Sequence, residues 1–390
     1  MTKSLFLQSQ FMFSTPSSQT DVARVARRYF AAKIFIVAVA FVAFFFSFGE
    51  GLEEDNYVYR VPRVTSFVDR FMPFDGQWYV QIAEQGYRIE PLYVNQRSIN
   101  FFPLYPALIA LLAPLVGAAA AGLVISYAAG FGAVYLLYRL LRQDYSAVIA
   151  GDTVWYVLIF PTAVVLSAVY TESLFLCLAI GALYAGRQRH WGVAALLGAL
   201  AALTRSVGGL ILIPLVVQYW AMHEWKISAL LRAGAIFCII PLAVFGYLGY
   251  VAALTGDVNA YRNAMAEGWL LHPTWPHHLF EHLTQRKLFG YRNGILDLGA
   301  GIVFVGLLPF IVRRLRPEYA AYAAVFTLVF WWYGNTASWL RYVFISWPHF
   351  LLLAELPTSL GRWRHWMLSA ALLLALTGFT LRFTNWQWIG

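Results

Sequence analysis

The segment FDGQWYVQIAEQGY, residues 74–87, contains the first carboxylate whose surroundings could support chemistry. Its spacing predicts a short helix that begins at Asp75 and stops at Gly86. Trp78 and Ile82 would then lie on one face of that helix. Asp75 would cap the helix, and an aspartate at a helix start beside a membrane is also placed to accept a proton from a hydroxyl group. Spacing alone leaves both roles open.

Three more ionisable residues border apolar runs: Glu172, Arg205 and Arg341. Glu172 follows Tyr170 and Thr171 at a turn between two such runs, where it either caps the next helix or belongs to a functional site. The guanidinium of Arg205 could clamp a phosphate, or it could reach out to lipid headgroups. Arg341 has the same two interpretations. We expect all three side chains on the same side of the membrane as Asp75.

A zinc-protease pattern, H-x-x-E-H, occurs at His278, Glu281 and His282. Such short patterns arise easily by chance, and no third ligand is identifiable, so a wet interfacial loop is the favoured interpretation. The two cysteines, Cys177 and Cys238, offer neither a disulfide framework nor a zinc spacing. We therefore predict no metal site.

The composition places these residues in a membrane protein. Of 390 residues, 60% are hydrophobic and only 12% are charged, which is far from the balance of a soluble domain. The net charge of +9 fits basic residues that flank membrane helices and contact anionic lipid. No basic stripe suggests a nucleic-acid partner, and membrane lipids are the expected surroundings.

A spanning helix needs about 20 apolar residues, and eleven stretches approach this length. The sequence therefore predicts an all-α polytopic membrane protein with about 11 transmembrane helices. The predicted spans are 33–48, 119–140, 146–164, 171–186, 191–205, 207–222, 233–253, 295–312, 318–334, 338–356 and 366–382.

The apolar run 101–117 is not counted as a span. Counting it would move Arg139 and Arg142 to the outside and invert every later connector. We expect it to lie along the outer membrane surface, where Pro103 and Pro106 suit the turn that begins it.

Basic residues in every second connector predict a cytoplasmic N-terminus. Residues 1–32 would form a basic cytoplasmic segment and residues 33–390 a single transmembrane domain. The first apolar segment has no A-x-A cleavage site and is interpreted as a retained helix. The long loops 49–118 and 254–294 would face outward and carry any chemistry. Short connectors and compact length favour a bacterial inner membrane over the endoplasmic reticulum.

Five segments in order resemble the PIG-V-type mannosyltransferase family, and the resemblance covers about residues 71–355. They are FDGQWYVQIAEQGY, NFFPLYPALIALLAPLVG, FPTAVVLSAVYTESLFLCLAIGALYAG, GALAALTRSVGGLILIPL and SWLRYVFISWPHFLLLAEL. The resemblance implies a GT-C-like helical bundle with outer-face juxtamembrane helices. It also implies transfer of a sugar from a polyprenyl- or dolichyl-phosphate carrier to a hydroxyl of a lipid or glycolipid acceptor.

Carried over residue by residue, the resemblance assigns Asp75, Glu172 and Arg205 to the site. Asp75 would act as general base in an inverting displacement, with Glu172 as the second acidic residue. Arg205 and Arg341 would hold the departing phosphate. We expect Trp78, Tyr79 and Tyr170 to line the donor side. The family usually has Trp before the aspartate; here Phe74 keeps an aromatic wall but lacks the indole N–H.

Because arginines can neutralise the phosphate, this scheme requires no cofactor. A divalent metal, if one bound, would be shared by Asp75 and Glu172. A polyprenyl-lipid transporter or flippase is the main alternative, because it would also explain the helices and the basic lipid contacts. It would not explain a long outer loop with a capped acidic helix. A membrane metalloprotease, resting on residues 278–282 alone, ranks third.

Overall fold

The computed structural model describes residues 18–45, 66–91, 96–269, 294–333, 338–356, 361–387 and 389. No β-strand occurs within these ranges. The helices are α1 (Ser18–Phe45), α2 (Asp75–Gln85), α3 (Leu104–Val116), α4 (Ala118–Leu141), α5 (Ala147–Leu158), α6 (Glu172–Arg187), α7 (Trp191–Ala202), α8 (Leu212–Met222), α9 (Ile227–Phe237), α10 (Ile239–Thr255), α11 (Ala260–Trp269), α14 (Gly294–Arg314), α15 (Pro317–Leu328), α16 (Trp339–Val343), α17 (Pro348–Glu355) and α18 (Gly361–Thr384). Short 3₁₀ turns are η2 (Val68–Phe71), η3 (Ser98–Asn100), η4 (Ala163–Ser167), η5 (Ser206–Ile211) and η6 (Val329–Tyr333).

Among the described residues, five helical segments are long and apolar enough to cross a membrane. They are Gln19–Phe45, Ala118–Leu141, Ile227–Thr255, Gly294–Arg314 and Trp363–Thr384. The other predicted spans coincide with shorter or interrupted helices: α5 ends at Leu158, ahead of Pro161, and the span predicted at 338–356 consists of the two short helices α16 and α17. The all-helical class is confirmed, whereas the count of eleven spans stays a prediction.

The first helix is longer than predicted. α1 begins at Ser18, well before residue 33, and its basic side chains contact other helices. Arg28 pairs with Asp152 at 3.0 Å, and the buried ammonium of Lys33 donates to the Leu166 carbonyl at 2.7 Å. Arg28 and Lys33 can lie within one continuous helix because each has a partner in the bundle. The basic residues before position 33 therefore did not mark the start of the helix.

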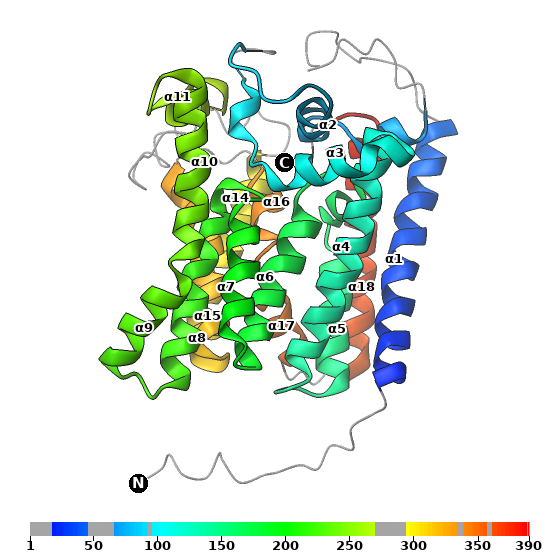
Figure 1. Cartoon of the computed structure of the whole chain (residues 1–390). Helices are drawn as coiled ribbons and strands as arrows, with labels where there is room; N and C mark the ends of the chain where they lie inside the picture. The colour runs from blue at the N-terminus through cyan, green and yellow to red at the C-terminus, as the bar shows by residue number, and fades with distance from the viewer. Residues whose placement is uncertain are drawn as a thin grey trace.

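The bundle has two distinct ends (Figure 1). α2 and α3 lie across one end, α11 lies at the same end next to α10, and Gly117 at φ 83° makes the sharp turn from α3 into α4. α3 thus lies across the bundle end instead of running alongside α4. At the other end, the connectors after α4 and α6 meet through the Arg187–Asp144 pair, 2.8 Å long. Which end faces the cytoplasm stays a prediction.

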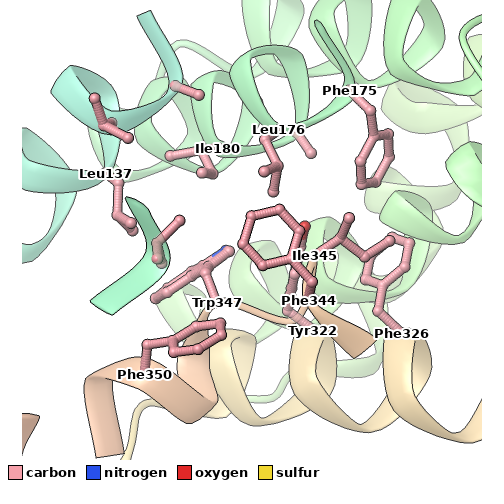
Figure 2. Packing of buried hydrophobic residues seen from close by; sticks show 14 of the residues in the cluster. Leu137, Phe175, Leu176, Ile180, Tyr322, Phe326, Phe344, Ile345, Trp347 and Phe350 are labelled. Carbon is pink, nitrogen blue, oxygen red and sulfur yellow. The ribbon is translucent and has the colours of Figure 1, made fainter. Parts of the chain in front are cut away.

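The core between the ends is apolar and aromatic. Figure 2 shows Phe344 and Trp347, which follow α16, packed in one cluster with Leu176 of α6 and Tyr322 of α15. Trp347 and Tyr322 are fully buried, and their rings lie 5.7 Å apart. This packing fixes the start of α6 against the segment around α16, which matters because both carry charged residues.

Candidate active site

Four charged side chains from distant parts of the sequence meet at the end of the bundle that α2 and α3 cover. We call them the charged network: Asp75, Glu172, Arg205 and Arg341. Arg341 Nη1 lies 2.9 Å from Asp75 Oδ2, and Arg341 Nε lies 3.6 Å from Glu172 Oε1. Arg205 Nη1 lies 3.2 Å from the same Glu172 oxygen. Two carboxylates and two guanidinium groups therefore form one continuous chain of ion pairs.

Asp75 is the most exposed member of the network, and Arg205 follows at 11%. The Asp75 side chain is 17% exposed, whereas those of Glu172 and Arg341 are 2% and 7% exposed. Because an incoming molecule would meet Asp75 before it met Glu172, Asp75 is the carboxylate best placed to contact a hydroxyl group from outside.

Three members of the network stand at the start of a helix or at a turn between helices, and the fourth, Arg341, lies in the short helix α16. Asp75 and Glu172 are the first residues of α2 and α6, where helix dipoles favour negative charge. Arg205 has extended backbone between α7 and η5, and Arg341 lies at the centre of α16. Helix starts and a turn thus position Asp75, Glu172 and Arg205, and a helix of five residues positions Arg341.

A glycine lets α2 approach the segment that precedes α6. A Cβ atom on Gly76 would lie 3.1 Å from Met72 Cβ and 3.2 Å from the Val169 carbonyl oxygen. The Val169 N–H donates to the Phe71 carbonyl at 2.8 Å in the same place. The residue after Asp75 must therefore be small for α2 to approach the segment that leads into Glu172.

Phe74 occupies an unusual backbone conformation, with φ 51° and ψ −111°. Positive φ at a bulky residue costs roughly 1–3 kcal/mol and is found at functional sites more often than elsewhere. The conformation turns the chain sharply into α2 directly before Asp75. Strain at this position is consistent with a site that fixes the carboxylate at the expense of stability.

Two tyrosines predicted for the donor side contact the network or its backbone. The Tyr170 hydroxyl donates to the Pro73 carbonyl at 3.1 Å, and the Tyr170 ring lies 5.3 Å from the Arg341 guanidinium carbon. The Tyr79 hydroxyl lies 3.4 Å from Thr171 Oγ1. Burial, reinforced by Asp75 and Glu172, raises the pKa of Tyr79, so its hydroxyl keeps its proton.

Trp78 is placed differently. Its ring stacks on Phe101 at 5.4 Å, and the side chain is buried in the contact between α2 and α3. The structure therefore gives Trp78 a packing role, and its part in donor binding stays a prediction.

Gly208, which follows Arg205 in η5, packs closely against α7: a Cβ atom there would lie 2.9 Å from the Ala201 carbonyl carbon.

Two residues near the network were not predicted from the sequence. The Tyr342 ring lies 5.1 Å from the guanidinium carbon of Arg341 and 5.9 Å from that of Arg205. Asp297 accepts a hydrogen bond from the Leu340 N–H at 2.8 Å. A signal for Asp297 existed, because it is an ionisable residue inside the apolar run 295–312.

The described residues contain no group of three or more His, Cys, Asp or Glu side chains that could hold a metal ion. The H-x-x-E-H pattern, residues 278–282, lies outside the described ranges.

A family model, mannosyltransferase (PIG-V), matches residues 61–255, which is half of the chain. No curated protein matches the chain. Among solved structures, the chain is similar to a crystal structure of the Archaeoglobus fulgidus oligosaccharyltransferase in complex with Zn and sulfate, with 14% sequence identity and a TM-score of 0.37. The alignment covers 82% of this chain and 48% of that one, so this chain spans about half the length of the oligosaccharyltransferase.

Proposed function

The chain belongs to the mannosyltransferase (PIG-V) family, and on this premise we propose that it is a membrane glycosyltransferase whose reaction centre is the charged network. In this proposal the donor is a sugar linked to a polyprenyl or dolichyl phosphate. The acceptor is a hydroxyl group of a lipid or glycolipid at the outer face of the membrane, and mannose is the first sugar to test.

The observation that carries the proposal is the joining of two carboxylates by two arginines in a nearly buried place. Desolvation makes buried ion pairs poor stabilisers of a fold, so their presence favours a functional explanation. Glu172 Oε2 is buried and makes no hydrogen bond to any described residue, and the buried Arg205 Nη1 has only its 3.2 Å ion pair with Glu172 Oε1, which lacks hydrogen-bond geometry. A bound anion would complete the coordination of Arg205.

The donor phosphate would bind Arg205 and Arg341, because guanidinium groups match phosphate oxygens in pairs. A phosphate there competes with Asp75 for Arg341 and weakens the ion pair between them. Asp75 is then available to the acceptor hydroxyl. Donor binding would in this way prepare the general base, and Glu172 would keep Arg205 oriented throughout.

In the transfer step, the acceptor oxygen forms a bond to the anomeric carbon while the bond from that carbon to the phosphate oxygen breaks. The leaving phosphate takes the electron pair, and its charge is stabilised by the two arginines. Asp75 takes the hydroxyl proton. Attack from the face opposite the phosphate would invert the anomeric configuration.

The test is to incubate the purified full-length protein with polyprenyl phosphates carrying mannose, glucose or galactose, together with a membrane lipid extract as acceptor. We expect one donor to be consumed, with release of the polyprenyl phosphate and appearance of a glycosylated lipid. If none of the donors is consumed, and the protein instead moves labelled donor across proteoliposomes, the proposal is wrong and the flippase alternative replaces it.

A further inference from the structure

The helix that carries Arg341 is too short to orient itself. α16 contains five residues, and a single helical turn has almost no stability of its own. Ser338, directly before it, has left-handed backbone with φ 67°. The direction of the Arg341 side chain must therefore be set by contacts between α16 and its neighbours.

One neighbour, α14, provides two such contacts a single turn apart. Asp297 Oδ1 accepts a hydrogen bond of 2.8 Å from the Leu340 N–H, which is one of the N–H groups left without a partner at a helix start. Four residues further on, Gly301 lies against the Trp339 indole, and a Cβ atom added there would be 2.6 Å from Trp339 Cζ3. Residues four apart share one face of a helix.

These contacts with α14 leave α16 little freedom to move. Asp297 is 2% exposed and Trp339 is 1% exposed. The Trp339 ring also lies 4.7 Å from that of Trp331, so it cannot swing away from Gly301 without disturbing a second indole. The Arg341 guanidinium group also interacts electrostatically with the Asp297 carboxylate.

We propose that Asp297 and Gly301 are positioning residues, which set the place of Arg341 between Asp75 and Glu172 through the backbone of α16. The inference rests on the proposed function in treating Arg341 as a phosphate ligand. Neither residue needs to touch substrate. Their effect is geometric: a shift of about 1 Å would break the 2.9 Å contact between Arg341 and Asp75.

The first test compares two alanine substitutions on α14 in the full-length protein. Gly301→Ala places a methyl group against Trp339, whereas a Cβ atom at Gly306 would have nothing within 4 Å. The readout is the rate at which phenylglyoxal modifies Arg341, measured by peptide mass spectrometry. We expect slow modification in the wild type and in Gly306→Ala, and several-fold faster modification in Gly301→Ala.

The second test separates the hydrogen bond from the charge. Asp297→Asn keeps an oxygen that can accept from the Leu340 N–H, whereas Asp297→Ala removes it. For protein that elutes as a single species, we expect the kcat of sugar transfer to fall by on the order of 10²-fold in Asp297→Ala. In Asp297→Asn most of the kcat should be retained. A purely structural role would reduce the yield of folded protein but not this kcat.

The labelling result does not depend on catalysis. If the wild type consumes no donor, the proposed function fails, but the labelling of Arg341 still decides whether α14 positions it. Unchanged labelling of Arg341 in Gly301→Ala overturns the inference. Equal kcat values for Asp297→Ala and the wild type overturn it as well.

Discussion

At Arg205, one guanidinium group contacts a carboxylate and two aromatic rings. It lies 3.2 Å from Glu172 and 5.9 Å from the rings of Phe175 and Tyr342. The sequence indicated that an arginine at the end of an apolar run would bind phosphate or headgroups, but it could not indicate this pairing. Ion pairs between residues far apart in the chain depend on tertiary packing, which no local pattern encodes. For the same reason the sequence singled out Asp75, Glu172 and Arg341 as site residues but could not indicate that Arg341 pairs with both carboxylates.

Substitution of Arg205 tests the phosphate-binding role. Arg205→Lys keeps the charge but loses the paired donors, so we expect kcat/KM to fall by about 10-fold to 100-fold. Arg205→Gln should lower it by on the order of 10²-fold or more. Arg187→Lys is the matched control, because the Arg187 side chain is 12% exposed, against 11% for Arg205, and pairs with Asp144 away from the network. Activity of Arg205→Gln within twofold of the wild type would remove Arg205 from the reaction centre.

Among the helices, patterns of hydrophobicity located most elements but not their ends. The predicted spans 171–186 and 295–312 agree closely with α6 and α14. The predicted span 191–205 is too long, because α7 ends at Ala202 and the chain then turns through Arg205. A continuous apolar run does not reveal such a turn, since the interior of a bundle is apolar for helices and turns alike.

Gly208 is required by the turn that holds Arg205. A Cβ atom there would collide with the Ala201 carbonyl group and lie 3.0 Å from Ala202 Cα, and backbone atoms cannot move aside as a side chain can. We expect Gly208→Ala to destabilise the protein by roughly 1–3 kcal/mol. Thermal unfolding in detergent should show a lower midpoint. Gly192→Ala, in α7 and with nothing within 4 Å of the added atom, should leave the midpoint unchanged or raise it slightly. Equal midpoints for the two variants would contradict this account of the turn.

At the scale of the whole molecule, the two ends of the bundle carry different kinds of ion pairs. The charged network lies at the end covered by α2 and α3, and Arg341 is almost buried there. At the opposite end, Asp144 pairs with Arg187 at 2.8 Å and with Arg316 at 3.3 Å, which ties the connectors together. The alternation of basic connectors in the sequence predicted that these arginines share an end. It could not predict that the four residues of the charged network would pair with one another at the other end.

This difference between the ends provides a direct test of the central claim. Asp75 and Asp144 are both aspartates paired with arginine, and their side chains are 17% and 20% exposed. Asp75→Asn leaves Arg341 with Glu172 as a partner, and Asp144→Asn leaves Arg316 with Glu318. Both variants should therefore fold.

The measurement is the rate of sugar transfer from a polyprenyl-phosphate donor by wild-type protein, Asp75→Asn and Asp144→Asn, each purified to a single species. We expect Asp75→Asn to lose activity by at least about 10²-fold, because the base that takes the hydroxyl proton is gone. Asp144→Asn should keep the wild-type rate. Full activity in Asp75→Asn, or equal losses in the two variants, would contradict the assignment of the charged network as the reaction centre.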